Sequence, residues 1–179
     1  KTETNKVKQR LQMELEKKYF VRTIQANRGT IKSLCRIYYA IYEDQKDAFQ
    51  DIVLQLWKSF DSFRGESEIN TWIYRVSLNT ILTKLRKSKK SVTAEPIDIR
   101  HHDISTAKAD DNVELLSIII QSLKDVDKAI MVLHLEGYGN REISEILKLS
   151  PTNIGTRLSR VKSELKKKFN MKSHAIKQS

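Results

Sequence analysis

The 179-residue chain has little of what builds disulfide frameworks, sheets or membrane spans. It has 1 cysteine, which excludes an internal disulfide framework and is compatible with a reducing compartment. With 5 glycines and 2 prolines, few tight turns are available, and the alternating Val, Ile and Thr runs of strands are missing. These shortages favour an all-α fold.

Long apolar runs are missing as well. None approaches the ~20 residues that a membrane helix needs, and no signal peptide is visible, so we expect a cytoplasmic protein without direct membrane insertion. The hydrophobic fraction of 39% is low for one large core but is enough for small amphipathic helical units. Cys35 lies in an apolar segment, and we expect a small core residue there rather than a reactive thiol.

What the chain has in excess is positive charge. The formal net charge is +11, which points to a polyanionic partner such as nucleic acid or an anionic membrane. The charge is unevenly spread: residues 1–90 carry a net +9, residues 91–112 a net −3 and residues 113–179 a net +5. Two basic segments therefore flank an acidic one, which we interpret as a flexible linker between two small helical domains.

Apolar periodicity predicts helices up to residue 59. Residues 1–18 form a charged N-terminal helix or tail, and residues 19–42 form two helices or one helix broken near Gly29. Residues 44–59 give the clearest amphipathic pattern, with Asp44 as the expected N-cap. The face predicted to be buried comprises Ala48, Phe49, Ile52, Val53, Leu56 and Trp57.

A loop from Phe60 then leads into a helix that Asn70 or Thr71 is expected to cap. This helix mixes aromatic, amide and basic side chains, with Trp72, Ile73, Val76, Ile81 and Leu85 expected to contribute to burial. Aromatic rings beside a polar loop suit single-stranded DNA, whose bases stack or flip into pockets. Two interpretations stay open from spacing alone: Phe63 and Trp72 stack on bases, or they only pack the domain.

Residues 91–112 lose apolar periodicity and read as the linker. They contain His101 and His102 followed by Asp103, a weak metal-site pattern. Adjacent histidines in a strand or coil point apart and no second ligand cluster accompanies them, so we expect no metal site and no cofactor.

Residues 113–170 predict a second helical unit, followed by a C-terminal tail at 171–179. Apolar side chains expected to face its core include Ala129, Ile130, Leu133 and Leu135. A helix from Asn140 to Leu147, a short turn, an N-cap at Ser150 and Pro151 at the first helical position form a helix-turn-helix. Its second helix is expected to turn Thr152, Asn153, Thr156, Arg157 and Arg160 outward, where amides and guanidinium groups suit base edges and hydroxyls suit phosphates.

Three stretches carry a resemblance to a known family. "DQKDAFQDIVLQLW", "SFRGESEINTWIYRVSLN" and "GYGNREISEILKLSPTNIGTRLSRVKSEL" are similar to bacterial RNA polymerase sigma factors of the extracytoplasmic-function type, most like Bacteroidetes members. The resemblance covers most of the chain, with residues 19–90 similar to sigma region 2 and 113–170 to region 4. It implies a transcription initiation factor without enzymatic activity that reads a −35 element as duplex and a −10 element as a melted strand.

The resemblance also implies site residues and partners. Contacts to the polymerase β′ clamp helices would come from Asp47, Gln50 and Asp51. Contacts to the −10 element would come from Phe63, Arg64, Gly65, Glu66, Ser67, Trp72, Arg75, Asn79, Lys84 and Arg86. Contacts to the −35 element would come from Thr152, Asn153, Thr156, Arg157, Ser159 and Arg160. Core RNA polymerase, including its β flap, and promoter DNA would be the partners, with an anti-sigma factor as a further candidate and no small-molecule substrate.

Two positions depart from the family pattern. Thr83 stands where an Asp is common, which puts −10 specificity in doubt, and Gly155 stands where Arg or Lys is common. Two other classes of function explain the sequence less completely. A helix-turn-helix repressor or activator with an N-terminal regulatory domain explains the second unit but not the basic aromatic helix. A hydrolase using Asp47, Asp51 and Glu66 lacks a second cluster of metal ligands.

Overall fold

The computed structural model describes residues 2–63, 68–91 and 120–176 of the chain. Those residues contain helices and no strand, as the shortage of strand-like runs predicted. The helices are α1 (Thr2–Ala26), α2 (Arg28–Tyr38), α3 (Tyr42–Ser59), a 3-10 turn η1 (Phe60–Ser62), α4 (Ile69–Ser91), α6 (Asp125–Leu135), α7 (Asn140–Leu147) and α8 (Pro151–Ile176). The linker and the His101–Asp103 pattern lie outside the described residues.

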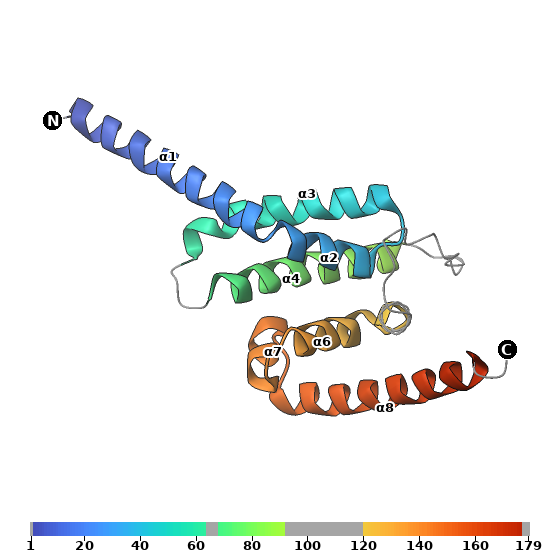
Figure 1. Ribbon diagram of the computed structural model, residues 1–179. Coiled ribbons are helices and arrows are strands. Elements are labelled where there is room, and N and C mark those ends of the chain that lie inside the picture. The colour runs from blue at the N-terminus through green and yellow to red at the C-terminus, as the bar shows by residue number, and fades with distance from the viewer. Residues whose placement is uncertain (1, 64–67, 92–119, 177–179) are drawn as a thin grey trace.

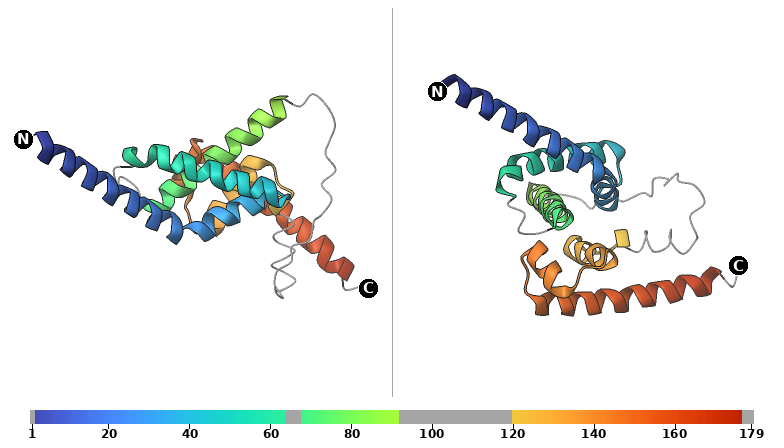
Figure 2. Two further views of the ribbon diagram at one scale, coloured as in Figure 1. Left: turned by 90° about the horizontal axis from the view of Figure 1, so that it is seen from above. Right: turned by 60° about the vertical axis from the view of Figure 1, so that its left-hand side comes forward.

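The helices form two units that pack against each other (Figure 1). In the first unit, α2, α3 and α4 contact one another, while most of α1 extends away from the body. In the second unit, α6, α7 and α8 form a small bundle. The second view in Figure 2 also places α3 on one outer side and α8 on the other, with α4 and α6 between them.

The buried apolar side chains form one continuous core that spans both units. Fully buried side chains of the first unit include Ile31, Leu34, Ile52, Leu56, Ile73, Leu78 and Ile81. Those of the second unit include Ile130, Leu133, Ile143, Ile146 and Ile154. The break expected near Gly29 is confirmed, because α1 ends at Ala26 and α2 begins at Arg28. Burial raises the pKa of the Cys35 thiol to about 11, which confirms Cys35 as a core residue rather than a reactive one.

Several predicted caps and buried positions were wrong. Helix α3 begins at Tyr42, so Asp44 lies in its first turn rather than at its N-cap. Helix α4 begins at Ile69, because the backbone N–H of Trp72 already bonds the carbonyl of Glu68; Asn70 and Thr71 are inside the helix. In each case the helix begins two or three residues earlier than the predicted cap indicated.

Two apolar side chains expected in the core are exposed. Trp57 is 40% exposed, although its ring edge contacts Phe20 at 4.9 Å between centroids. Leu135 is 53% exposed at the end of α6. Both lie in the last turns of their helices.

The interface between the two units brings α4 against α6 and α7, and it joins the end of α2 to the start of α6. The Tyr38 hydroxyl donates to the backbone oxygen of Asp125 at 2.9 Å, and the Asp125 carboxylate pairs with Lys89 at 2.6 Å. The tyrosine rings of Tyr74 and Tyr138 meet edge to face, 5.6 Å between centroids. The first unit thus contacts the start of α6 and the segment that leads into the helix-turn-helix.

A buried lysine is part of the same interface. Lys128 is only 7% exposed, and its Nζ donates to the backbone oxygen of Ile37 at 3.3 Å and lies 5.1 Å from the centre of the Tyr38 ring. Burial lowers the pKa of this ammonium group. Because Ile37 is in the last turn of α2, its carbonyl has no partner within the helix, and Lys128 supplies one.

Candidate nucleic-acid interface

The helix-turn-helix forms as the sequence predicts. Helix α7 begins where Glu142 accepts a hydrogen bond from the backbone N–H of Gly139 at 2.7 Å. The turn passes through Lys148, whose φ of 56° is left-handed, and the Ser144 hydroxyl donates to the Leu149 carbonyl at 2.6 Å. These bonds close the turn and fix the direction in which α8 leaves it.

The start of α8 is capped as expected. The Ser150 hydroxyl accepts a hydrogen bond from the backbone N–H of Asn153 at 3.2 Å, and Pro151 occupies the first helical position. Ile154, Leu158 and Val161 are buried. The cap and the buried stripe together determine which side chains α8 presents outward.

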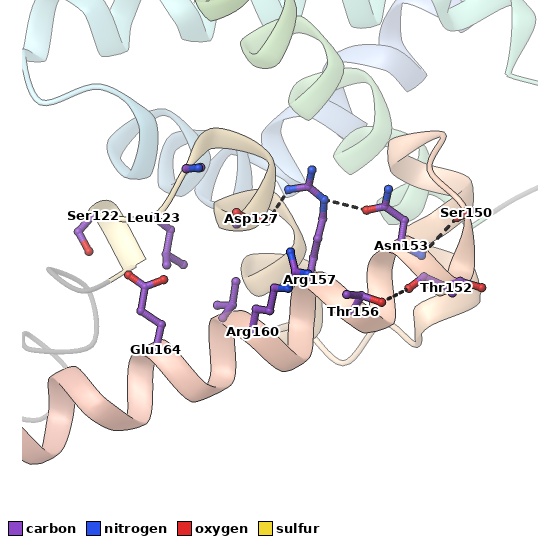
Figure 3. Close-up of a pocket in the computed structure, with 12 residues that line it drawn as sticks. Ser122, Leu123, Asp127, Ser150, Thr152, Asn153, Thr156, Arg157, Arg160 and Glu164 are labelled. Carbon is purple, nitrogen blue, oxygen red and sulfur yellow. Dashed lines mark hydrogen bonds and ion pairs between the residues drawn. The ribbon is translucent and has the colours of Figure 1, made fainter.

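Five of the six predicted −35 residues are exposed: Thr152, Asn153, Thr156, Ser159 and Arg160. The sixth, Arg157, is half-buried and bonded within the protein, its Nη1 to Asp127 at 2.8 Å and its Nε to Asn153 at 2.7 Å (Figure 3). The Thr156 hydroxyl donates to the Thr152 carbonyl at 2.9 Å. The sequence pattern predicted that Arg157 faces outward. In the structure its guanidinium group instead forms an ion pair with Asp127, which links α8 to α6.

These side chains border a groove of about 820 Å³ between the start of α6 and the first turns of α8. The residues that line it are mainly polar or charged, including Lys124, Asp127 and Arg160. Such a lining suits a polar, phosphate-bearing partner rather than an apolar small molecule.

The aromatic residues of the first unit form a packed cluster. Trp72 is 6% exposed, and its ring lies 6.0 Å from Phe60 and 5.1 Å from Phe63 between centroids. Phe60 in turn packs on Phe20 at 5.1 Å. Of the two interpretations left open by the sequence, packing describes Trp72 in this structure, while Phe63 is only half-buried beside the start of the loop.

The polar residues predicted to meet the −10 element lie along α4. Asn79, Lys84 and Arg86 are exposed, and Arg75 is half-buried with a buried Nε that has no hydrogen-bond partner among the described residues. Arg64, Gly65, Glu66 and Ser67 lie outside the described residues. The structure therefore brings part of the predicted set onto one helix and leaves the loop untested.

On α3, Asp47 and Gln50 are exposed and Asp51 is half-buried. The Asp51 carboxylate pairs with Lys84 of α4 at 2.6 Å, so the residues predicted for polymerase and for DNA adjoin each other. Leu54, which is 48% exposed, lies one turn further along from Gln50 and Asp51. Sequence reasoning missed Leu54, although it lies two residues from Ile52 and therefore on the opposite side of the helix from the predicted apolar face.

Two family models match the chain. "Sigma-70 region 2" matches residues 23–91 and "Sigma-70, region 4" matches residues 115–165, which together are more than half of the chain. The chain belongs to the extracytoplasmic-function sigma factors. This sigma factor is a transcription initiation factor that directs RNA polymerase to promoters.

Curated relatives of this sigma factor carry the same family name. It is 24% identical to the extracytoplasmic-function RNA polymerase sigma factor SigM of Mycobacterium tuberculosis, over 74% of this chain and 67% of the relative. It is 27% identical to the sigma-E factor of Haemophilus influenzae, over 73% and 77% of the two chains. It is 28% identical to the RNA polymerase sigma factor YlaC of Bacillus subtilis, over 79% and 92%.

Solved structures agree on the fold. The sigma factor RpoE, in a complex with the anti-sigma factor NepR from Bartonella quintana, superposes with a TM-score of 0.70 at 16% identity, over 86% of this chain and 98% of that one. CnrH, in a complex with the cytosolic domain of CnrY, gives a TM-score of 0.61 at 16% identity, over 87% and 90%. The special likeness to Bacteroidetes members is not shown by these comparisons, and no enzyme family is among the matches.

No described helix is long and apolar enough to cross a membrane. Among the described residues, no group of three or more His, Cys, Asp or Glu side chains is placed to hold a metal ion.

Proposed function

We propose that this sigma factor divides initiation between its two units. Residues 19–90 hold core polymerase and capture a melted −10 strand, and residues 113–170 read the −35 element as duplex. This division is supported by two surfaces of different chemistry on one chain. Helix α8 is a capped helix with exposed polar residues. Helix α3 has an exposed acidic face beside the basic helix α4.

The polymerase contact is assigned to the outer face of α3. Asp47 and Gln50 are exposed there, and Leu54 adds an exposed apolar side chain one turn on. A polar rim around an apolar contact is the usual composition of a protein interface. We therefore add Leu54 to Asp47, Gln50 and Asp51 as a contact to the β′ clamp helices.

The −10 contact is assigned to α4 and to the loop that precedes it. Exposed Asn79 can donate and accept, which suits a base edge, and exposed Arg86 suits the DNA backbone. Lys84 is paired with Asp51, so in this arrangement it also links the two faces. The ring of Trp72 packs against the ring of Phe63. The loop residues Arg64 to Ser67 remain predicted to form the pocket of an extruded base.

The −35 contact is assigned to the exposed part of α8. Ser150 caps the N-terminus of α8. The exposed hydroxyl groups of Thr152, Thr156 and Ser159 suit phosphates, and the methyl groups of the two threonines suit a thymine methyl group. Arg160 is exposed and can reach a guanine edge or a phosphate. The β flap of the polymerase would contact this unit, and the acidic linker would follow the path of nucleic acid through the enzyme.

One solved neighbour of similar fold, the sigma factor RpoE, is in a complex with the anti-sigma factor NepR. We propose that an anti-sigma factor also controls this chain, by covering the same surfaces that polymerase and DNA need.

Gel filtration with core RNA polymerase separates this proposal from a helix-turn-helix repressor or activator. The full-length chain should co-elute with core polymerase, and the complex should retain a promoter fragment that core alone does not. A chain that binds duplex DNA but elutes apart from core would favour the repressor or activator.

A further inference from the structure

Asp127 lies outside the helix-turn-helix but is tied to its recognition helix. It is in the first turn of α6, and its Oδ1 lies 2.8 Å from Nη1 of Arg157 on α8. The two side chains are 18% and 38% exposed, so the pair is partly shielded from water. A shielded, charge-assisted hydrogen bond holds geometry better than a solvated surface pair.

The same arginine continues the chain of bonds to Asn153. Its Nε donates to Oδ1 of Asn153 at 2.7 Å (Figure 3). An arginine N–H can only donate, so the amide must turn its oxygen toward Arg157 and its Nδ2 group the other way. The Asn153 backbone N–H is held by the Ser150 hydroxyl at 3.2 Å, which fixes this residue at both ends.

This arrangement changes the chemistry that α8 offers to a base. Two of the five donors of Arg157 are used inside the protein, whereas Asn153 is exposed in the first turn of the helix. The first turn is where recognition helices make most contacts to base edges. Asn153, with a fixed amide, is therefore better placed to read a base than Arg157.

We propose that Asp127 is a positioning residue for −35 recognition, which acts through Arg157 to hold the Asn153 amide with Nδ2 outward. The inference rests on the proposed −35 function and adds how one base pair is selected. An outward NH₂ group suits an acceptor: N7 or O6 of guanine, N7 of adenine or O4 of thymine. Cytosine presents its N4 donor in the major groove and should be the base least tolerated there.

The test uses full-length sigma factor with core polymerase on duplex promoters that carry each of the four bases at every −35 position. Wild type should disfavour cytosine at one position by roughly three- to tenfold, the effect of one hydrogen bond. Asp127→Asn and Asn153→Ala should each remove this discrimination. The double variant should lose no more than either single one, because all three residues act as one unit.

Matched variants distinguish the positioning role of Asp127 from a general effect of its charge and from a loss of folding. Asp125→Asn removes the same charge two residues away, from a carboxylate that pairs with Lys89, and should leave base preference unchanged. Arg157→Lys keeps the charge but cannot bridge two partners with the same planar fork, so discrimination should be lost although the ion pair can re-form. Thermal unfolding and core binding of each variant check that the fold is intact.

Two results would overturn the inference. One leaves the proposed −35 function standing and the other removes it as well. If Asp127→Asn keeps the preference while Arg157→Ala abolishes it at one base pair, Arg157 reads that base directly and the relay is wrong, but the −35 function stands. If wild type shows no base preference at any upstream position, the proposed −35 function itself fails.

Discussion

Gly155 lies in the recognition helix, where glycine is less favourable than alanine by about 0.5–1 kcal/mol. A Cβ added there would lie 3.5 Å from Nδ2 of Asn140, an ordinary van der Waals distance. We therefore expect Gly155→Ala to raise the free energy of unfolding by about 0.5–1 kcal/mol, measured by denaturant titration.

Gly137 supplies the opposite control for the same substitution. Its φ is +92°, a backbone conformation that side chains rarely adopt, so Gly137→Ala should lower the stability instead. Equal effects of the two substitutions would show that backbone conformation does not govern them.

Asn79 is exposed on α4 and carries the −10 assignment. Unstacking a base costs a few kcal/mol, which a pocket offsets by hydrogen bonds and stacking. We expect Asn79→Ala to keep core binding and −35 binding but to form few open complexes on duplex promoters, measured by permanganate footprinting of thymines. A template with a pre-melted −10 bubble should restore part of the signal. Normal thymine reactivity on the duplex promoter would exclude the assignment.

The Asp51–Lys84 ion pair joins α3 to α4. Reversing the charges of Asp47 and Asp51 together should abolish core binding while the fold stays intact. Part of that loss would come from the broken Asp51–Lys84 ion pair, because reversing Asp51 places two partly exposed cations beside each other. The swap Asp51→Lys with Lys84→Glu restores the internal pair and should still bind core poorly in gel filtration. Recovery of core binding by the swap would mean that Asp51 acts only through Lys84.

The existence and faces of the long helices could be predicted from sequence, and their ends could not. The apolar periodicity of 44–59 and of 140–161 reports which side faces the core, because burial dominates the choice. The start of α3 instead depends on backbone bonds such as Gln45 N–H to the Ile41 carbonyl, and on the Gln45 side chain bonding Tyr39. Asp44 fits a cap locally, but these bonds begin the helix before it.

In the candidate site, too, local features could be predicted from the sequence and contacts between distant residues could not. The turn, cap and outward face of the helix-turn-helix follow from local chemistry at Ser150 and Pro151. The capture of Arg157 by Asp127 joins residues 30 positions apart, and no local pattern indicates which of the nearby acids will reach it. The burial of Trp72 is equally hard to predict, since it depends on the rings of Phe60 and Phe63, which lie outside α4.

At the scale of the whole molecule, the two units are packed closer than a promoter allows. The −35 and −10 elements are named for positions about 25 base pairs apart, roughly 85 Å of duplex at 3.4 Å per base pair. Helices α4 and α8 are separated by a layer of helices, and packed helices lie about 8–10 Å apart. We therefore expect the units to separate when both elements are bound.

Substitutions of Lys128 test how strongly this residue stabilises the interface between the two units. Lys128→Glu would place a carboxylate against the Ile37 carbonyl and near Asp125, and should increase the distance between the units. Lys128→Met keeps a similar volume without charge and should leave them packed. Energy transfer between dyes at Lys58→Cys and Lys166→Cys measures the distance, since Cys35 is buried and protected from labelling. An equal distance in both variants would exclude a role for Lys128 at the interface.

This sigma factor directs polymerase to promoters, and we propose that it does so through two DNA surfaces of different chemistry. The most direct measurement is in vitro transcription with core RNA polymerase on a library of randomised promoters, followed by sequencing of the templates that yield transcripts. We expect two enriched elements at a constant spacing, with the base preference at one upstream position lost in Asn153→Ala and the downstream element weakened in Asn79→Ala. Transcripts that depend on a single element, or none above core polymerase alone, would contradict it.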